Sequence, residues 1–354
     1  MRPFPHNPIT PNHGAPMKQL STLLAMLLVI LALTPPAHSA NGVRIGHFPN
    51  ITHAQPLVGR DLGIFEKKIG QQIDWKVFNA GPSEMEALIA GHIDIAYVGP
   101  NPAVNAFLRS KGKALRIIAG ASSGGAALVV PAGSTARTPA DFKGKKVASP
   151  ELGNTQDVAL RTWITSAGLR PGRDVTILSI KNPDILMLFQ QRKLDGAWVP
   201  EPWVTRLVRE GGGRVLLDER SLWPEGKFPT TIVVVRQEYL AKNREVVRRF
   251  LDAHVEVTEL IRKNPDDACR RLNGQLARLM GKSLPPELLR AAFSRLQPTY
   301  DPLRAPLLTS AHWAKGLGFL PRQADLARDT AGLFDMTLLN EILKKRALPP
   351  VRER

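Results

Sequence analysis

GPSEMEALIAGHIDIAYV at residues 81–98 and NPDILMLFQQRKLDGAWV at residues 182–199 align with each other at a shift of 101 positions. The matched positions are Pro82 with Pro183, Asp94 with Asp195, Ala96 with Ala197 and Val98 with Val199, and Tyr97 stands opposite Trp198. Each copy then enters a proline turn, GPNP at 99–102 and PEP at 200–202. Generic helix–strand patterning is the alternative explanation for four identities in 18 positions. The run Asp-x-Ala-aromatic-Val before a proline turn nevertheless favours two related lobes.

Short β-branched runs alternate with helical stretches around these two copies. Buried strands are expected at VRIGHF (43–48), IDWKVF (73–78), IDIAYV (93–98) and LRIIAG (115–120), and ALVVP, KKVASP, DVTILSI, LDGAWV and TTIVVVR continue the pattern. This alternation predicts an α/β chain with mainly parallel sheets and helices on both faces. Two such lobes would place the carboxyl ends of their strands opposite one another, where open sheets bind ligands.

The composition excludes several classes of protein. The 354 residues include 48 Lys and Arg against 31 Asp and Glu, a formal charge of +17, and 43% are hydrophobic, which is enough to bury a core. A single cysteine, Cys269, excludes an internal disulfide framework, a Cys-based zinc site and a Cys-ligated iron–sulfur cluster. The basic residues are interleaved with acidic ones, and no zinc-finger spacing is present. We therefore predict a solvated basic surface rather than a nucleic-acid partner.

The first forty residues read as an export signal. LSTLLAMLLVILAL at 20–33 is uncharged and follows Lys18, but it is shorter than the roughly 20 residues that span a bilayer. TPPAHSAN follows and supplies a helix breaker and small residues, so we predict a signal peptide at 1–39 that is cleaved near Ser39 or Ala40. An uncleaved anchor is the alternative, and Met17 is a second candidate start. The mature protein is expected to be soluble and periplasmic.

Two loops at the ends of the early strands carry small polar residues. HFPNITHAQP at 47–56 offers Asn50, Thr52 and His53 as hydrogen-bond donors, although His53 could equally be a capping or buried structural histidine. GPNPAV at 99–104 offers Asn101 in a stiff turn, and a plain turn is the alternative.

Two further loops suit an anion. GASSGG at 120–125 has the pattern G-x-S-x-G with Ser122 at its centre, but a serine hydrolase needs a helix next, and AALVVPAGS reads as a strand. Hydroxyls and glycine N–H groups directed at an anion fit the segment better. In SPELGNTQDVALRTWI at 149–164, Asn154, Thr155 and Gln156 stand at a helix N-terminus, which is an anion site by geometry and dipole, or an ordinary cap.

A fifth loop, WVPEPW at 198–203, offers Trp198 and Trp203 as walls for an apolar part of a ligand and Glu201 as an acceptor for an ammonium group. Core packing is the alternative for Trp198. None of the side chains singled out is Lys or Arg, so an anion would be held by neutral donors. The mature chain has five histidines without H-E-x-x-H, and no Walker loop or Rossmann fingerprint follows a strand, so we predict no metal and no cofactor.

The ordered series of motifs resembles a known family over about residues 43 to 330. GHFPNITHAQPLVGRDLGIFEKK, ALIAGHIDIAYVGPNP, TPADFKGKKVASPELGNTQDVALRTWI, LDGAWVPEPW and AHVEVTELIRKNPDDA are similar to the nitrate/sulfonate/taurine group of substrate-binding proteins of ABC importers, and FPNITHA is most similar to the aliphatic sulfonate branch. The resemblance implies a two-lobe type II periplasmic binding protein fold, with two doubly wound sheets joined by a two-strand hinge. The chain would cross between lobes near 126–131 and 230–236. The implied lobes are 40–128 with 233–335, and 129–232, followed by a tail at 336–354.

The resemblance also implies a function. The expected protein is a monomeric receptor, not an enzyme, that captures a small organic anion such as an aliphatic sulfonate or taurine by hinge closure and delivers it to a membrane permease with its ATPase. The implied ligand-binding residues are Asn50, Thr52, His53, Gly99, Pro100, Asn101, Ser122, Ser123, Gly124, Asn154, Thr155, Gln156, Glu201 and Trp203. Nitrate, an aromatic acid or a thiamin precursor is the alternative ligand, and an exported hydrolase using Ser122 and His53 is the alternative of a different class. A related branch makes the thiamin pyrimidine with a cysteine-rich motif, and the lone Cys269 argues against it.

Overall fold

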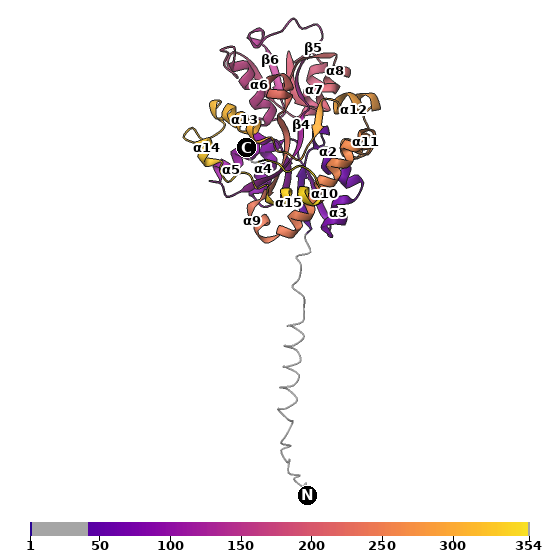
Figure 1. The fold of residues 1–354 in the computed structure, drawn as a ribbon. Helices are drawn as coiled ribbons and strands as arrows, with labels where there is room; N and C mark the ends of the chain where they lie inside the picture. The colour runs from indigo at the N-terminus through magenta and orange to yellow at the C-terminus, as the bar shows by residue number, and fades with distance from the viewer. Residues whose placement is uncertain (2–41, 353–354) are drawn as a thin grey trace. The chain divides into compact units, whose positions relative to one another are not determined.

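In the computed structural model, which describes Met1 and residues 42–352, the chain builds two β-sheets flanked by helices (Figure 1). The apolar run of the predicted signal peptide and its cleavage site lie outside the described residues. None of the helices within 42–352 is long and apolar enough to cross a membrane.

The first sheet has six strands in the order β11-β4-β10-β3-β1-β2. These strands are β1 (Val43–His47), β2 (Ile73–Val77), β3 (Ile95–Val98), β4 (Leu115–Gly124), β10 (Pro229–Arg236) and β11 (Leu296–Pro298). β1 pairs in parallel with β2 and β3, whereas β10 is antiparallel to both β3 and β4, and β11 is antiparallel to β4. The four strands β1 to β4 therefore run in one direction, and β10 and β11 run in the other.

The second sheet has five strands in the order β7-β6-β8-β5-β9. These strands are β5 (Ala126–Pro131), β6 (Lys146–Ser149), β7 (Thr176–Ser179), β8 (Gly196–Pro200) and β9 (Gly213–Asp218). Only β5 runs against the others, because it pairs antiparallel with both β8 and β9. The prediction of an α/β fold with two sheets is confirmed, but both sheets are mixed rather than mainly parallel, because the inner strands β10 and β5 and the edge strand β11 are reversed.

The two sheets share one topology. The strand order β2-β1-β3-β10-β4 in the first sheet corresponds, in position and direction, to β7-β6-β8-β5-β9 in the second. Among these strands, the reversed one in each sheet is the strand that the chain forms on arriving from the other sheet: β5 follows β4, and β10 follows β9. Only Gly125 separates β4 from β5, and the chain returns to the first sheet through β10. The segments 126–131 and 230–236, where crossings were predicted, lie in these two reversed strands. The lobe limits at 128 and 233 stay a prediction.

Helices surround both sheets. Those that follow strands of the first sheet are η1 (Ile51–His53), α2 (Ala54–Asp61), α3 (Ile64–Ile69), α4 (Gly81–Ile89) and α5 (Pro100–Arg109). Those of the second sheet are η2 (Pro139–Phe142), α6 (Thr155–Thr165), α7 (Asn182–Gln190), α8 (Trp203–Arg209), η3 (Glu219–Leu222) and η4 (Pro224–Gly226). The C-terminal part adds α9 (Gln237–Lys242), α10 (Arg244–Lys263), α11 (Pro265–Met280), α12 (Pro286–Phe293), α13 (Arg304–Gly316), α14 (Leu326–Asp329) and α15 (Thr337–Lys345).

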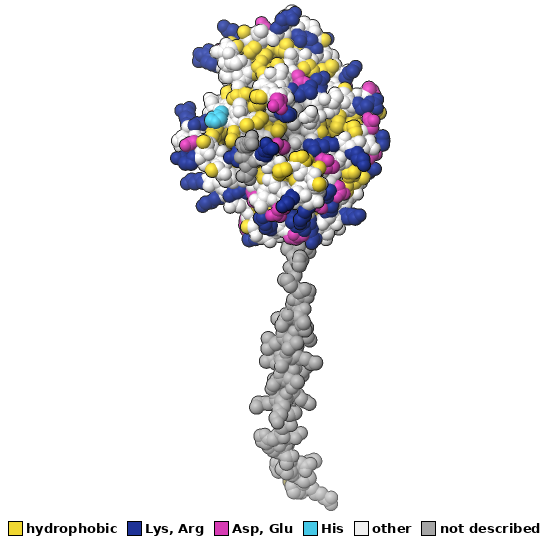
Figure 2. All heavy atoms as spheres, in the orientation of Figure 1, with side chains coloured by type: hydrophobic (Ala, Val, Ile, Leu, Met, Phe, Trp, Pro, Cys, Tyr) yellow, Lys and Arg dark blue, Asp and Glu magenta, His cyan; other side chains and the backbone are white. Residues whose placement is uncertain are grey.

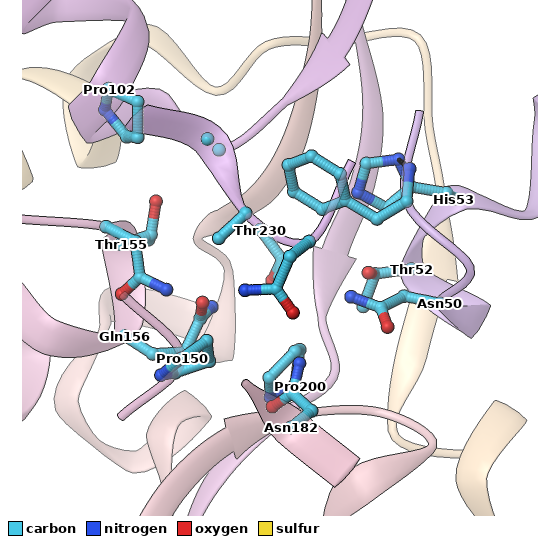
Figure 3. A pocket seen from close by; sticks show the side chains of 16 residues that line it. Asn50, Thr52, His53, Pro102, Pro150, Thr155, Gln156, Asn182, Pro200 and Thr230 are labelled. Atoms are coloured by element: carbon cyan, nitrogen blue, oxygen red, sulfur yellow. Dashed lines mark hydrogen bonds between the residues drawn. The ribbon is translucent and has the colours of Figure 1, made fainter. Parts of the chain in front are cut away.

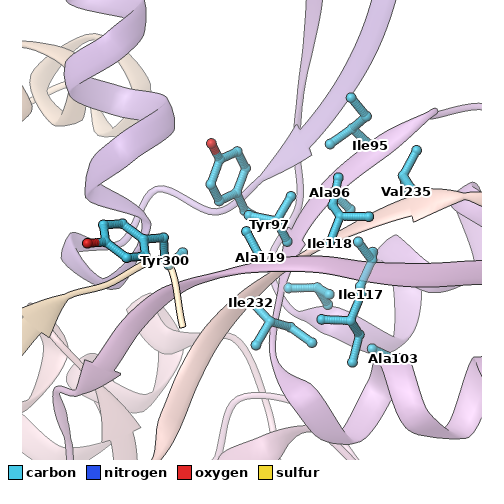
Figure 4. Packing of buried hydrophobic residues seen from close by; sticks show 14 of the residues in the cluster. Ile95, Ala96, Tyr97, Ala103, Ile117, Ile118, Ala119, Ile232, Val235 and Tyr300 are labelled. Carbon is cyan, nitrogen blue, oxygen red and sulfur yellow. The ribbon is translucent and has the colours of Figure 1, made fainter. Parts of the chain in front are cut away.

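The C-terminal helices complete the core of the first sheet. One large apolar cluster contains strand residues such as Tyr97 and Ile232 together with residues of α10 to α15, and Figure 4 shows the packing around Tyr97. Two smaller clusters cover the two faces of the second sheet. In the tail predicted at 336–354, Arg346 bonds Asp252 of α10, so α15 is tied to the same core.

The repeat found in the sequence is present in the structure. α4 and α7 have the same length at a shift of 101 residues, and β3 and β8 begin at that same shift. The shared aspartate makes the same bond in both copies: Arg44 N donates to Asp94 Oδ2 at 3.1 Å, and Lys146 N donates to Asp195 Oδ2 at 2.8 Å. This aspartate recurs because it ties the start of one strand to the neighbouring strand, which is a structural role.

The aromatic residue of each copy also has a buried polar partner. Tyr97 Oη lies 2.9 Å from His254 Nδ1, and Trp198 Nε1 donates to Glu219 Oε2 at 2.7 Å. Both aromatic side chains are fully buried, where an unpaired hydroxyl or indole N–H would destabilise the fold. Trp198, considered above as a ligand wall, is therefore a core residue.

The basic side chains that give the chain its high positive charge are spread over the visible surface (Figure 2). Figure 2 shows Lys and Arg side chains spread over the visible face with Asp and Glu between them, rather than gathered in one stripe. Many are paired, as Arg248 and Arg249 are with Glu245 on α10. On the face that Figure 2 shows, this distribution agrees with a solvated basic surface.

Replacing Glu84 by leucine is expected to stabilise the protein, and to do so more strongly as the pH rises. Glu84 on α4 is fully buried, neither carboxyl oxygen has a hydrogen-bond partner among the described residues, and burial raises its pKa well above the usual value of 4.5. The equivalent position in the repeat is the buried Ile185. Below pH 4.5 both the folded and the unfolded state are protonated, so the group has no effect.

Above that pH only the unfolded state ionises, and the folded protein loses about 1.4 kcal/mol of stability per pH unit until the folded pKa is reached. Thermal melts of Glu84→Leu and the parent protein at pH 5 and pH 8 check this. A gain in melting temperature that is the same at both pH values, or a loss at pH 8, would contradict it. Glu86→Leu on the same helix, which is solvent-exposed, is the control.

Candidate functional site

A small cavity lies where loops from the two sheets meet, and sixteen residues line it. The first sheet and the segments attached to it contribute Phe48, Asn50, Thr52, His53, Asn79, Ala80, Gly81, Gly99, Pro102 and Thr230. The second sheet and the segments attached to it contribute Pro150, Asn154, Thr155, Gln156, Asn182 and Pro200. The space open to the centres of water molecules is about 20 Å³, and Figure 3 shows Thr155 and Gln156 across the cavity from Asn50, Thr52 and His53. We call this space the inner cavity.

Four helices begin at the inner cavity. Its walls include Gly81 of α4, the N-cap Gly99 of α5, the N-cap Asn154 of α6, and Asn182, the first residue of α7. Each helix has nine to eleven residues, and α4 and α5 come from the first sheet whereas α6 and α7 come from the second. Free backbone N–H groups and the positive ends of four helix dipoles therefore converge on one point, which favours a negative charge there.

Asn50 is oriented by the other sheet. Its Oδ1 accepts a hydrogen bond from Trp203 Nε1 at 3.1 Å, and Ile51 N next to it donates to Glu201 O at 3.2 Å. Because the carbonyl oxygen of the carboxamide is occupied by Trp203, the NH₂ group is the end left for a ligand. These bonds join the first strand's loop to the start of α8.

His53 presents one donor. Phe48 N donates to its Nδ1 at 3.2 Å, so that nitrogen carries no proton. Burial lowers the pKa of His53 well below 6.5, with the nearby His47 adding to the effect, and the ring is neutral at physiological pH. A neutral ring with an unprotonated Nδ1 carries its proton on Nε2, which makes His53 a neutral hydrogen-bond donor.

The start of α6 combines a satisfied cap with an unsatisfied hydroxyl. Asn154 Oδ1 accepts from Asp157 N at 2.7 Å, while Asp157 is held by Ser149 Oγ, Gly153 N and Arg161 Nε. Thr155 Oγ1 is buried and has no hydrogen-bond partner among the described residues. A buried hydroxyl without a partner costs free energy, so this group is suited to a bond with a bound molecule.

None of the described residues that line the inner cavity has a charged side chain. The polar groups of this cavity are amides, hydroxyls and one neutral imidazole, and the carboxylate of Asp157, which follows the lining residue Gln156, is already bonded to Arg161. Neutral donors and helix N-termini stabilise an anion without a strong ion pair, which favours reversible binding. No group of His, Cys, Asp and Glu within 42–352 is arranged to hold a metal ion.

Seven of the residues singled out in the sequence lie together on the inner cavity: Asn50, Thr52, His53, Gly99, Asn154, Thr155 and Gln156. The others lie elsewhere. Asn101 is turned toward α13, where its amide exchanges hydrogen bonds with Ser310 O at 3.1 Å and Ser310 Oγ at 2.8 Å. Pro100 opens α5 and does not line the cavity.

The serine-rich segment is part of β4 rather than a loop. Ser122, Ser123 and Gly124 pair with β11 and, in part, with β10, and Ser122 Oγ makes no hydrogen bond with His53. Ser123 lines a separate surface hollow with Arg220 and Arg295. No helix follows Ser122, so the strand–helix elbow that a serine nucleophile requires is not formed here.

Glu201 and Trp203 are buried beside the inner cavity and do not line it. Glu201 accepts from Thr205 N at 3.1 Å and Thr205 Oγ1 at 2.9 Å, and Arg295 Nε lies 3.0 Å from Oε1. Burial raises the pKa of Glu201 to about 7 despite these partners. The carboxyl group predicted to accept from an ammonium is thus fully engaged by the protein itself.

Nine of the sixteen lining residues were not predicted from the sequence, and three of these nine have polar side chains. Asn79 follows β2, Asn182 follows β7, and Thr230 lies in β10 with its hydroxyl bonded to Gly124 O. Asn79 comes after β2, which pairs with β1, and Asn182 comes after β7, which pairs with β6. The position of both asparagines after the carboxyl ends of these strands could have identified them as candidate ligand-binding residues.

Comparisons with known proteins agree with this architecture. The model of the NMT1-like family matches residues 37–273. The taurine-binding periplasmic protein of Escherichia coli K12 is 30% identical over 236 residues, which is 65% of this chain and 71% of that protein. A putative aliphatic sulfonates-binding protein of the same organism is 28% identical over 232 residues, covering 65% and 69% of the two chains.

Solved structures show the same fold. The alkanesulfonate-binding protein SsuA from Xanthomonas axonopodis pv. citri, bound to MOPS, superposes with a TM-score of 0.68 at 23% identity and covers 81% of this chain and 96% of that one. The periplasmic nitrate-binding protein NrtA from Synechocystis PCC 6803 gives a TM-score of 0.73 at 16% identity, with coverages of 87% and 89%. These likenesses support the two-lobe type II periplasmic binding protein fold.

Proposed function

The chain belongs to the NMT1-like family, and from that membership we propose that it is a periplasmic receptor for a small organic anion of the aliphatic sulfonate or taurine type. The anion would be captured between two lobes, residues 40–128 with 233–335 and residues 129–232, and delivered to an ABC permease driven by its ATPase. The protein would act as a monomer after removal of residues 1–39.

One observation carries this proposal: the N-termini of α4, α5, α6 and α7, two from each sheet, line a single cavity that holds neutral donors and no charged side chain. A sulfonate is fully ionised at any physiological pH and accepts several hydrogen bonds at once. Helix N-termini and neutral donors can satisfy those acceptors, and the absence of an ion pair allows release to the permease.

The contacts between the sheets support capture by closure. Trp203 of α8 bonds Asn50, Ile51 bonds Glu201, and Ser83 Oγ lies 3.4 Å from Glu151 Oε2, so both walls of the inner cavity touch. Only two links run between the sheets in sequence, through Gly125 and through the segment that joins β9 to β10. A pair of such links is a geometry in which one lobe can rotate against the other.

The alternative of a hydrolase finds less support. Ser122 lies within a strand and His53 offers its Nδ1 to Phe48, so a nucleophile–base pair is not assembled. The named relatives are binding proteins for taurine, sulfonates and nitrate.

The test is a thermal-shift panel on protein exported and purified from the periplasm of a Gram-negative host, stripped of ligand by unfolding and refolding. The panel holds taurine, alkanesulfonates of graded length, an aromatic sulfonate, nitrate, sulfate and phthalate. A ligand at 100 times its Kd should add about 2.7 kcal/mol, a rise of a few degrees. Selective stabilisation by sulfonates is the expected result.

If only nitrate or only phthalate stabilises the protein, that anion is the ligand and the sulfonate assignment is wrong. A panel without any stabilisation, together with turnover of a model ester, would overturn the receptor proposal. Mass spectrometry of the same sample shows whether residues 1–39 have been removed.

A further inference from the structure

A second cavity adjoins the inner one and has a different character. It is larger, about 300 Å³, and shares three asparagines with the inner cavity: Asn50, Asn79 and Asn182. Its other walls are Pro49, Pro183, Trp203, Arg206, Leu279 and Met280. We call it the outer groove. The two spaces therefore adjoin at these three asparagines.

The outer groove is mostly apolar and has one ionisable group. Arg206 lies over the Trp203 ring with its guanidinium carbon 4.7 Å from the ring centroid, and it forms a two-point hydrogen bond with Glu210, both contacts being 2.9 Å. Its side chain is only 13% exposed. The arginine is therefore fixed in place as part of the wall.

Among the residues that the structure describes, no carboxylate lines either space. The acids close by are engaged elsewhere: Glu201 with Thr205 and Arg295, Glu210 with Arg206, and Glu151 with Ser83. An ammonium group on a ligand's tail would therefore lose water, gain no counter-charge and lie near a fixed guanidinium. Burying a charge without a partner is costly, and the Glu210 carboxylate, which balances the Arg206 guanidinium, is not free to pair with the ammonium.

Building on the proposed function, we propose that the physiological ligand is an organic monoanion with an uncharged tail, and that the outer groove discriminates against zwitterions such as taurine. The anionic head occupies the inner cavity, and the tail lies against Trp203, Leu279 and Met280. Arg206 is the residue that determines this specificity. The ligand class is thus an alkyl- or hydroxyalkylsulfonate rather than an aminosulfonate.

Three sulfonates of equal size test this directly: taurine, isethionate and propane-1-sulfonate, which differ only in a terminal ammonium, hydroxyl or methyl group. Calorimetric titration of the ligand-free exported protein should give Kd values for isethionate and propane-1-sulfonate that are roughly tenfold or more below that for taurine. Taurine binding as tightly as the other two would overturn this inference and leave the receptor role intact. If none of the three binds, the sulfonate assignment fails and the inference fails with it.

Substitution of the arginine provides the second arm. Arg206→Gln removes the positive charge and frees Glu210, so it should reduce the preference for propane-1-sulfonate over taurine at least severalfold, mainly by improving taurine. Arg209→Gln, on the same helix but solvent-exposed and outside both spaces, is the matched control and should leave the preference unchanged. Thermal melts of both variants without ligand establish that they fold. An unchanged preference in folded Arg206→Gln would overturn the assigned role of Arg206.

Discussion

Replacing Thr155 with valine is expected to weaken sulfonate binding roughly ten- to a hundredfold while leaving the free energy of unfolding unchanged or slightly raised. Thr155 Oγ1 is buried on the wall of the inner cavity and has no hydrogen-bond partner within residues 42–352. A hydrogen bond from this hydroxyl to an anion is worth about 1.5–3 kcal/mol, and valine removes it while preserving the shape of the side chain. Without ligand, the same change removes an unsatisfied buried polar group, so the folded protein loses nothing.

The chain offers a matched control for this prediction. Thr162 lies on the same helix, its hydroxyl is also buried without a hydrogen-bond partner among the described residues, and it does not line the inner cavity. Thr162→Val should therefore leave affinity unchanged. Titration calorimetry and denaturant unfolding of both variants separate binding from stability. If Thr155→Val and Thr162→Val bind sulfonate equally well, Thr155 does not contact the ligand.

The second large effect is expected from Gly99→Val. Gly99 is the N-cap of α5 with φ −70° and ψ 152°, a conformation open to any residue, so valine introduces no backbone strain. A Cβ at this position would collide with Thr155 Oγ1 and lie 3.4 Å from Thr155 Cβ, across the junction of the two sheets. The added side chain keeps the two walls of the inner cavity apart and so opposes the closed arrangement.

Affinity should fall roughly ten- to a hundredfold, by the usual cost of overpacking, while the melting temperature without ligand stays close to that of the parent. Small-angle scattering should show that ligand no longer reduces the radius of gyration. Gly133→Val, at an exposed turn of the second sheet where a Cβ meets nothing within 4 Å, is the control. Full compaction and full affinity in Gly99→Val would contradict closure at this junction.

The architecture could be predicted from the sequence because the residues that recur in the two copies are ones that the fold itself requires. Asp94 and Asp195 bond the starts of neighbouring strands, and Pro82 and Pro183 stand in the first turn of α4 and α7, where a missing N–H costs nothing. Such residues recur wherever the same unit is built. The reversed strands β5 and β10 were less evident, because strand direction depends on where the chain crosses between sheets rather than on local pattern.

The site was predicted well where its chemistry is local and poorly where it depends on distant partners. Asn154 and Thr155 were identified because a helix N-terminus can be recognised from a few consecutive residues. In the sequence, Asn101 and Glu201 are as plausible ligand-binding residues as Asn154 is. In the structure Asn101 is bonded to Ser310 and Glu201 to Arg295, and both partners lie far along the chain. Asn182 aligns with Gly81 in the repeat, so comparison of the two copies gave no sign that its side chain lines the cavity.

One chain is expected to bind one organic anion reversibly at the junction of its two sheets. Calorimetric titration of propane-1-sulfonate into the ligand-free exported protein, followed by recovery and identification of the sulfonate, tests it most directly. We expect a single site per chain, loss of affinity in Thr155→Val, and ligand returned chemically unchanged. Absence of binding, binding that Thr155→Val does not weaken, or conversion of the sulfonate to a product would contradict it.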